Sequence, residues 1–524
     1  MDSTCARRSF AKLLRAAALA AIALTGAGCV PGYVPEDRTD RRPRELQVTA
    51  HAGGTHHRTL IENNRWFQSL GNAVLVIDPV NGRELGRVEV MPFGESGSVT
   101  DMVVSGDTLF AICDRTAIAE IDVTEAASPK VMAIRDAKSL GLEPRLVSKV
   151  GEEYYISGPD GVVRIGDSKR FLAGQAAGRV VDSKEGPITS VGRRILALQD
   201  GRYLGAATEL QPLPAGVQPA GGYLFVLQGG NGATVGIMSD AFAELGKVEV
   251  PAFVRRARLL GDRLWVVTDR ILYTWRLDGG KFVEPEEVKL KGARDIDEIR
   301  PNHYAVGGTF GRAMYRHKRE GRQTEDTFYN VQREPGMLEI ALCDGRRVLA
   351  GGREGFWRWR IGGEAELVEK SIDVTAIPAK QVSAAWGSAR IMTEKSKDSA
   401  IEYGASVEVK FGDQTLIYTP TGGPHIVTIA LVDGDIWIGH ELGVDVLRRI
   451  EEPARKDPKT GKMLPPSVRV DPIRELRFEG PALFIFPENL GGGAAVVSLH
   501  GGFVLVKPVA VGAAPSFRGR GDLK

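Results

Sequence analysis

The chain has 524 residues, of which 43% are hydrophobic and 26% charged, and it contains 63 glycines. This is the composition of a globular protein enriched in glycine, and it excludes disordered and collagen-like chains. Residues 1–28 carry four basic residues and one acidic residue, so the overall charge of +2 leaves −1 for the remainder. Binding to nucleic acid is therefore not expected, and the length predicts one large repeat array or two to three domains.

The N-terminus has the pattern of an export signal. Basic residues at Arg7, Arg8, Lys12 and Arg15 precede an apolar run over 16–24 and a group of small residues that ends at Cys29. The apolar run is too short for a stable membrane span. We therefore expect residues 1–28 to be a signal peptide that is removed on export.

The residues before Cys29, LTGAGC over 24–29, resemble the bacterial lipobox. That resemblance implies diacylation of Cys29, palmitate-type acyl chains and a lipid anchor. Gly26 departs from the Leu or Val that the motif usually has there, so ordinary cleavage and release as a soluble periplasmic or secreted protein stays open. Val30 is not the acidic residue that retains many lipoproteins at the inner membrane, which favours the outer membrane.

Three further segments follow from composition. Residues 29–60 contain many polar residues, Pro and Gly, and are predicted to be a flexible tether. Residues 61–510 form the predicted propeller region, and 511–524 a disordered tail. Besides Cys5 and Cys29, only Cys113 and Cys343 remain; two buried thiols are the expectation, with a disulfide as the alternative.

A turn recurs along the chain, in which Gly and a polar residue precede an apolar strand. It is seen at Gly106, Gly151, Gly192, Gly222, Gly261, Gly345 and Gly434, and in weaker form at Asn64, Asn302, Gly387 and Gly493. The average spacing is about 43 residues, and each unit reads as four short strands, such as 99–104, 108–113, 117–123 and 130–134. This pattern predicts an all-β fold, a β-propeller of four-stranded antiparallel blades.

Two segments carry a resemblance to known repeats. VLVIDPVNGREL over 74–85 is similar to quinoprotein-like propeller repeats, and IDVTEAASPKV over 121–131 is similar to the LVIVD repeat of exported bacterial proteins. The resemblance implies an exported, lipid-anchored propeller, as in the lipoprotein of the outer-membrane β-barrel assembly machinery. Eleven turns exceed the usual four to eight blades, so the chain is predicted to form one elaborated ring or two rings.

No catalytic signature is found. His440 begins a sequence like the zinc-protease motif, but Val444 stands where the second histidine is needed. Asp295, Asp297 and Glu298 are expected on a solvated strand edge, with calcium at a propeller mouth as the alternative. His51, His56 and His57 are predicted to decorate the tether without a metal. No cofactor, metal or catalytic residue is therefore assigned.

Three features are candidate partner-binding elements. A basic cluster contains Arg312, Arg316, His317, Lys318, Arg319 and Arg322, with a charged blade edge as the alternative interpretation. Trp357 and Trp359 share one face of an alternating strand, where they either pack in the core or offer a stacking surface. The loop over 451–471 is a longer insertion that is either a partner site or a tolerated surface loop.

The sequence therefore favours a non-enzymatic, lipid-anchored propeller. We expect it to act as an interaction scaffold or assembly factor for envelope proteins or cell-surface polysaccharide. The alternative is an exported hydrolase or lyase that acts on polysaccharide or lactone through carboxylates at the central channel.

Overall fold

The computed structural model describes residues 44–510 apart from short gaps. The gaps are 91–97, 114, 216, 218–220, 321–322, 334, 336–337, 344–346, 353–354, 361–364, 370–375, 396–401, 421–424, 453, 457–461, 465–466, 479–480, 489–492 and 500–501. The signal peptide, Cys29 and the predicted tail lie outside the described residues. Almost all regular secondary structure in the described chain is antiparallel strand, and a single-turn helix, α2 (Ala137–Leu140), follows β9.

Residues 59–332 form seven antiparallel sheets, which we call the ring, and each sheet is a blade. Blades 1 to 3 consist of β2 (Thr59–Glu62), β3 (Arg65–Leu70), β4 (Ala73–Ile77) and β5 (Glu84–Glu89); β6 (Val99–Ser105), β7 (Thr108–Cys113), β8 (Ala117–Asp122) and β9 (Lys130–Asp136); and β10 (Leu146–Val150), β11 (Glu153–Gly158), β12 (Gly161–Arg164) and β13 (Arg170–Phe171). Blade 4 consists of β14 (Ile188–Val191), β15 (Arg194–Ala197) and β16 (Tyr203–Gly205), and residues 177–181 join it as a first strand through bridges to Val191 and Ile188. Blades 5 to 7 consist of β17 (Glu209–Pro212), β18 (Tyr223–Gln228), β19 (Ala233–Met238) and β20 (Glu244–Val250); β21 (Arg256–Leu260), β22 (Arg263–Val267), β23 (Ile271–Asp278) and β24 (Lys281–Lys289); and β25 (Ala293–Arg300), β26 (His303–Gly308), β27 (Gly311–Glu320) and β28 (Gln323–Gln332).

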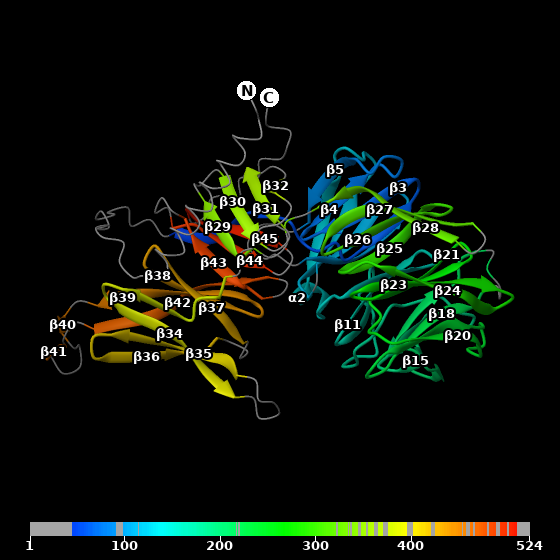
Figure 1. The fold of residues 1–524 in the computed structure, drawn as a ribbon. Coiled ribbons are helices and arrows are strands. Elements are labelled where there is room, and N and C mark those ends of the chain that lie inside the picture. The colour runs from blue at the N-terminus through cyan, green and yellow to red at the C-terminus, as the bar shows by residue number, and fades with distance from the viewer. Residues whose placement is uncertain are drawn as a thin grey trace, which may run out of the picture.

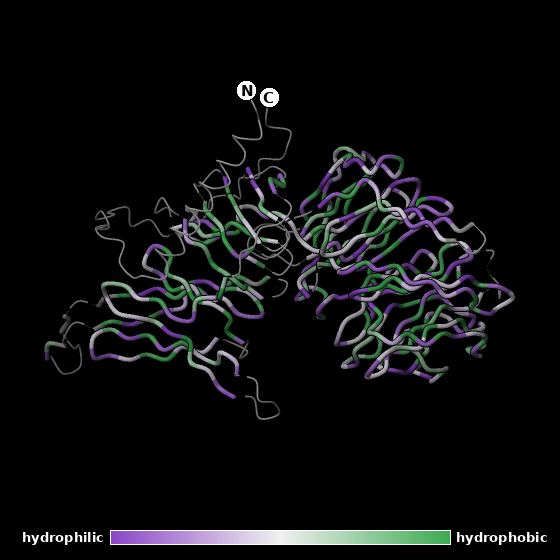
Figure 2. Tube along the Cα trace, viewed as in Figure 1, coloured by the Kyte–Doolittle hydropathy of each residue, from purple (hydrophilic) through white to green (hydrophobic). Residues whose placement is uncertain are grey.

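The middle strands of a blade are apolar on both sides because each sheet packs between two neighbours. All five residues of β4, with the sequence AVLVI, are buried. Val74 and Val76 face blade 2, where they meet Met102 and Ala119, while Leu75 and Ile77 face blade 7. Figure 2 shows the result as hydrophobic segments that run through the sheets, with hydrophilic segments at their ends.

Blade 7 closes the ring against blade 1 without a shared strand. Every strand of blade 1 comes from 59–89 and every strand of blade 7 from 293–332. The two blades meet through a core that contains Trp66 of β3 and Met314 of β27, and the first strands β2 and β25 lie side by side. Side chains rather than a strand exchange therefore hold this junction.

The remaining strands form a second group, which we call the four-sheet unit (Figure 1). Its strands form four four-stranded sets: β29 (Ile340–Cys343), β30 (Arg347–Gly352), β31 (Gly355–Arg360) and β32 (Ala365–Glu369); β43 (Phe484–Pro487), β44 (Ala495–Leu499), β45 (Gly502–Ala510) and β1 (Arg44–Ala52); β37 (Ile426–Val432), β38 (Asp435–His440), β39 (Gly443–Glu452) and β42 (Ser467–Arg477); and β33 (Gln381–Ala384), β34 (Gly387–Lys395), β35 (Glu402–Phe411) and β36 (Gln414–Tyr418). One residue pair between β35 and β37, Gly404↔Ile426, joins the last two sets into a single eight-stranded sheet. In that order each set shares a hydrophobic core with the next. The hairpin β40 (Arg455–Lys456) and β41 (Met463–Leu464) occupies the predicted insertion over 451–471.

Strand β1 corrects the predicted tether, because residues 44–52 are part of a sheet. β1 pairs antiparallel with β45 from Arg44↔Ala510 to Ala52↔Phe503, and Leu46 and Val48 are buried in the core. The polar and glycine-rich composition concealed two apolar positions with strand spacing. The chain then enters the ring, so the ring lies between β1 and β29 of the four-sheet unit.

The predicted repeat is confirmed. Each of the seven blades, and three of the four strand sets of the four-sheet unit, contains one of the predicted turns; the remaining turn, at Gly345, lies outside the described residues. In blade 4 the turn at Gly192 joins the second and third strands, whereas in blade 2 the turn at Gly106 joins the first and second. That difference explains the short spacing between Gly192 and Gly222. Cys113 and Cys343 are both buried thiols, as expected.

Prediction for the closing strand. Val48→Asp places a carboxylate in the core that β1 shares with β37–β39 and β44–β45, and it should cost about 3 kcal/mol or more. The neighbouring Gln47→Asp, at a partly exposed position, is the matched control and should change stability little. Urea unfolding of both variants checks this; equal stability of the two would show that β1 contributes nothing to the unit.

Candidate functional site

Charged side chains from five blades and from the segment just before β2 meet at the axis of the ring. We call this set the axial girdle; it comprises Arg58, Asp101, Arg179, Glu209, Arg256, Arg258, Asp295 and Asp297. Each residue lies in or beside the first strand of its blade. Since the first strands surround the axis, their polar side chains converge there although they are up to 239 positions apart in the sequence.

Asp295 of β25 is the most connected member. Its side chain is fully buried, and its Oδ2 accepts hydrogen bonds from the backbone N–H of Thr59 at 2.9 Å and from Arg58 Nη1 at 3.0 Å. Arg258 of β21 donates to both carboxylate oxygens, at 3.0 and 2.9 Å. Asp295 thus joins blade 7 to blades 1 and 6.

Asp101 plays the same part on the other side of Arg58. Arg58 Nε lies 3.3 Å from Asp101 Oδ1, and Arg179 donates to both oxygens of Asp101 at 2.7 and 2.8 Å. The backbone N–H of Val147, in blade 3, donates to Asp101 Oδ2 at 2.9 Å. Arg179 belongs to blade 4, so this one carboxylate connects four consecutive blades.

The charges alternate in sign around the axis. Arg256 lies 3.8 Å from Asp295 and 3.4 Å from Glu209, and the charge of Glu209 in turn helps to raise the pKa of Arg179. Ion pairs therefore run in the order Arg179, Asp101, Arg58, Asp295, Arg256 and Glu209. Arg258 and Asp297 add a further pair at 2.9 Å.

The surroundings keep the carboxylates ionised. Burial alone would raise the pKa of Asp295, but Arg258, Arg58 and Arg256 outweigh it and hold the pKa well below its ordinary value. Burial also opposes ionisation of Asp101, and Arg179 and Arg58 again lower its pKa. Burial, followed by the neighbouring charge of Arg258, lowers the pKa of Arg58 to about 9.

This arrangement suits cohesion better than acid–base chemistry. A general acid needs a carboxyl group that is protonated near neutral pH, whereas Asp101 and Asp295 are held as carboxylates by arginines. Their remaining contacts go to backbone N–H groups of neighbouring blades. The girdle therefore acts as an electrostatic clasp across the blades.

The structure corrects both interpretations of the acidic segment 295–298. Asp295 and Asp297 are buried against Arg258, on neither a solvated edge nor an open calcium site. In the described residues no three His, Cys, Asp or Glu side chains are placed to hold a metal ion. The sequence did not reveal the other girdle members, because their partners are distant along the chain. The available signal was Asp101, an aspartate within the apolar strand Val99–Ser105, where an acidic side chain needs a buried partner.

The predicted basic cluster is not a single cationic surface. Arg312 is buried, and Arg316 forms an ion pair of 2.9 Å with Glu325 on the paired strand β28. His317 is fully buried, 2.9 Å from Asp326. Strand β28 places acidic residues opposite the basic strand, which the local charge count overlooked. Lys318 is exposed; Arg322 and the side chain of Arg319 lie outside the described residues.

The two tryptophans belong to the core. Trp357 and Trp359 are 2% and 1% exposed and pack against the sheet that contains Phe503. The ring of Trp359 meets that of Phe503 edge-on, with centroids 4.9 Å apart. The stacking-surface interpretation is therefore wrong, and the core-packing alternative holds.

The histidines singled out from the sequence are also packed. His440 and Asp445 are fully buried and 3.2 Å apart, with Tyr418 donating to the same carboxylate at 2.9 Å. His56 is fully buried, and its Nδ1 lies 2.6 Å from the carbonyl oxygen of Ser69. Burial lowers the pKa of His51 to about 4. These residues join elements together and do not decorate a tether.

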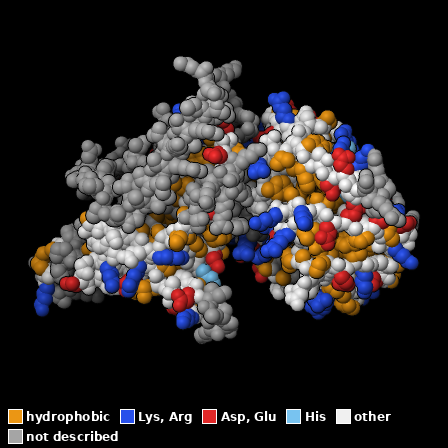
Figure 3. All heavy atoms as spheres, in the orientation of Figure 1, with side chains coloured by type: hydrophobic (Ala, Val, Ile, Leu, Met, Phe, Trp, Pro, Cys, Tyr) orange, Lys and Arg blue, Asp and Glu red, His pale blue; other side chains and the backbone are white. Residues whose placement is uncertain are grey.

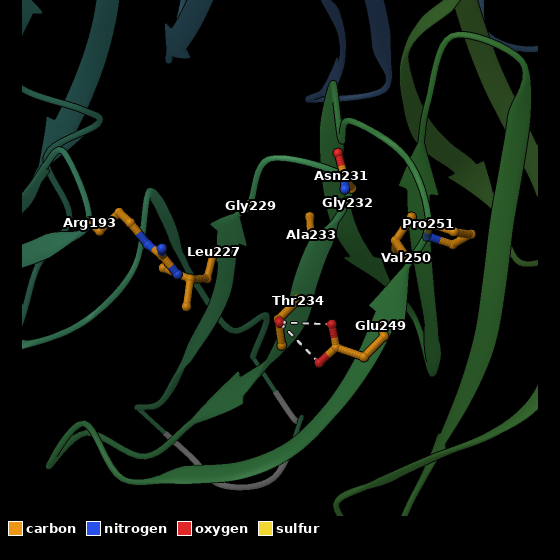
Figure 4. A pocket seen from close by; sticks show the side chains of 10 residues that line it. All are labelled: Arg193, Leu227, Gly229, Asn231, Gly232, Ala233, Thr234, Glu249, Val250 and Pro251. Carbon is orange, nitrogen blue, oxygen red and sulfur yellow. Dashed lines mark hydrogen bonds between the residues drawn. The ribbon is translucent and has the colours of Figure 1, made fainter.

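An open groove lies beside blade 5, with a volume of about 570 Å³ (Figure 4). Arg193 of blade 4 forms one side, near Leu227 of β18, while Asn231 and Pro251 lie on the other. Thr234 donates to Glu249 at 3.0 Å within it. The groove is on the face where second strands turn into third strands, the face from which the first strands begin.

Seven antiparallel sheets arranged around an axis with meander connections define a β-propeller. No family model and no curated relative matches the chain. Similar solved structures include the surface component PorZ of Porphyromonas gingivalis, with 12% identity, 86% of this chain and 79% of PorZ covered, and a TM-score of 0.40. A second is the extracellular domain of BT4673 from B. thetaiotaomicron, with 11% identity, 91% of this chain and 74% of that domain covered, and a TM-score of 0.35. A third is the Cps50 (Swd1) β-propeller domain of Myceliophteria thermophila, with 12% identity, 51% of this chain and 96% of that domain covered, and a TM-score of 0.38. Identities this low bear on fold alone.

Prediction for the girdle. Asp295→Asn keeps the shape of the side chain but leaves Arg58 and Arg258 without their shared countercharge, which should cost about 3–5 kcal/mol. Asp167→Asn removes an exposed partner of Arg164 and should leave the melting temperature nearly unchanged. Calorimetry on both variants decides whether the girdle stabilises the ring; similar small shifts in both would contradict it.

Prediction for pH. The folded pKa of Asp295 is depressed, so its stabilising contribution is present above the unfolded value of about 3.9 and is lost as pH falls below it. The difference in unfolding free energy between the wild type and Asp295→Asn should be about 1 kcal/mol smaller at pH 3 than at pH 7. Denaturant titrations at the two pH values measure it, and a constant difference would refute this assignment.

Proposed function

We propose that the protein is a lipid-anchored, non-enzymatic propeller that serves as an interaction scaffold or assembly factor in the bacterial cell envelope. The observation that carries this proposal is the axial girdle. In many ring-shaped enzymes the axis supplies the reactive groups, but here the axial carboxylates are bound by arginines and by the backbone of neighbouring blades. A rigid ring with an occupied axis is suited to binding through its outer surfaces.

The surface composition supports an interaction role. Large apolar side chains are exposed on several blades, among them Val80, Met132 and Tyr203, with exposures of 67%, 65% and 60%. Figure 3 shows apolar patches on the ring interspersed with Lys, Arg, Asp and Glu side chains. A non-obligate interface is about as apolar as the rest of a protein surface, so a surface of this kind is compatible with reversible binding. The hydrolase or lyase alternative gains no support from the girdle.

The membrane attachment rests on Cys29 and the signal-like residues before it. Strand β1 begins at Arg44, 15 residues beyond Cys29, and a chain of that length spans at most about 50 Å. An acylated Cys29 would thus keep the four-sheet unit near a membrane. No helix in the described part of the chain is long and apolar enough to cross a bilayer.

Prediction for the anchor. Cys29→Ser removes the acyl acceptor, so the protein should move from the membrane pellet to the soluble periplasmic fraction. Cys5→Ser lies in the segment that would be cleaved and should leave the distribution unchanged. Immunoblots of fractionated cells measure both; a pellet signal that survives Cys29→Ser would mean that another element attaches the protein.

The scaffold role is tested by reversible crosslinking in cells that express the full chain. We expect specific envelope proteins to be recovered with the wild type and in lower yield with Cys29→Ser. Recovery of no partner, together with turnover of polysaccharide or lactone by the purified protein, would favour the enzyme instead.

A further inference from the structure

Five cationic residues and one phenylalanine form a band across blades 4 to 7 on the groove-bearing face of the ring. We call it the arginine strip; its members are Arg193, Phe253, Arg255, Arg270, Lys291 and Arg294. Arg193 and Arg270 lie in turns between second and third strands, and the others lie in or just after the connections between blades. All six therefore belong to the same face of the ring.

Contacts link Phe253, Arg255, Arg270 and Arg294, and Arg193 lies across the groove from this set. Arg193 and Pro251 line the same groove, and Phe253 follows two residues later. The guanidinium carbon of Arg255 lies 4.9 Å from the centre of the Phe253 ring. Arg255 and Arg294 both bind Asp269, at 3.0 and 2.5 Å, and the carbonyl oxygens of Asp269 and Arg270 accept the N–H groups of Gly292 and Leu290.

The strip carries more positive than negative charge. Asp269 is shared by Arg255 and Arg294, and Glu249 in the groove binds Thr234. Arg193, Arg270 and Lys291 are exposed, and no carboxylate of the described residues forms an ion pair with them. Phe253, with 56% of its surface exposed, adds an apolar group in the middle. Exposed arginine beside exposed aromatic surface is the composition of interface hot spots.

Turn chemistry does not require these arginines. On the opposite face, the turns between third and fourth strands of blades 1 to 6 carry aspartates, namely Asp78, Asp122, Asp167, Asp200, Asp240 and Asp278. Several of them accept a hydrogen bond from the backbone two residues later, as Asp122 does from Thr124 at 2.9 Å, so they shape the turn. Arg193 and Arg270 make no such contact.

We propose that the arginine strip is the docking site for an acidic peptide segment of a partner protein, a proposal that rests on the scaffold function above. Arginine recognises carboxylates with paired N–H groups, and clusters of arginine select acidic motifs. A peptide fits the strip better than a sugar polymer, because Arg255 already covers one face of the exposed ring.

The test uses the purified full chain and a fluorescein-labelled decapeptide of eight Glu and two Phe, followed by fluorescence anisotropy. We expect binding that weakens as salt rises from about 50 to 200 mM. Arg193→Glu with Arg270→Glu should weaken binding at least about tenfold. The matched control, Arg316→Glu with Lys318→Glu, changes the net charge equally in the predicted basic cluster and should weaken binding less than about twofold.

Further arms separate the competing explanations. Phe253→Ser, which leaves the charge unchanged, should weaken binding about fivefold if Phe253 is an anchor. A peptide with Gln in place of Glu that binds equally well, or equal losses in both double variants, would overturn the proposal. Tighter binding of the polyuronate alginate than of the peptide would also overturn it in favour of a glycan. Crosslinking in cells separates the two proposals. If the wild type and the double variant (Arg193→Glu together with Arg270→Glu) recover the same partners in equal yield, the docking role of the strip is refuted while the scaffold function stands. If the wild type recovers no partner, the scaffold function itself fails.

Discussion

The ring depends on Asp295, because blades 7 and 1 share no strand. A propeller whose last blade borrows a strand from the first part of the chain is closed by backbone hydrogen bonds, but here each of these blades is complete in sequence. Asp295 binds the backbone of Thr59, at the start of blade 1, and the side chains of Arg58 and Arg258. Asp297 repeats the contact two residues later through the N–H of Ile61 at 2.9 Å. These two side chains of one strand, together with the core around Trp66 and Met314, thus connect the two blades.

Burial strengthens the ion pairs of the girdle and also requires that each of their charges has a partner. An ion pair inside a protein gains from the low dielectric but loses the hydration of both partners, so a pair is stable only when every charge is compensated. The alternation of sign around the axis meets that condition for the two most buried carboxylates, because Asp101 lies between Arg58 and Arg179 and Asp295 lies between Arg58 and Arg258. The same condition explains why the axis is a poor place for catalysis: a group able to change its protonation would leave its neighbours uncompensated.

The sequence was sufficient for the repeat but not for the axis. The turn at Gly106, with φ of +59°, needs glycine for its left-handed backbone, and such local requirements recur with the blade and are visible in the sequence. The partners of Asp295 lie 37 and 237 positions away, so their meeting depends on how many blades close the ring, which the period alone does not determine. Likewise, the basic run suggested a cationic surface, because Glu325 and Asp326, which pair with Arg316 and His317, come from the next strand. Val48 escaped notice because one strand among polar residues has too few apolar positions to reveal itself.

The order of the strands gives the ring two attachments to the four-sheet unit. The N-terminal strand β1 and the C-terminal strand β45 pair in that unit, and the ring is inserted between β1 and β29. The two connections touch, since a Cβ on Gly53, whose φ is +74°, would lie 2.2 Å from the carbonyl oxygen of Pro335. The ring is therefore joined to the four-sheet unit by two adjacent connecting segments rather than by one. β1 is also the described strand nearest in sequence to Cys29. Its pairing with β45 therefore connects the proposed anchor to the C-terminal sheet, and the chain that follows β1 connects both to the ring.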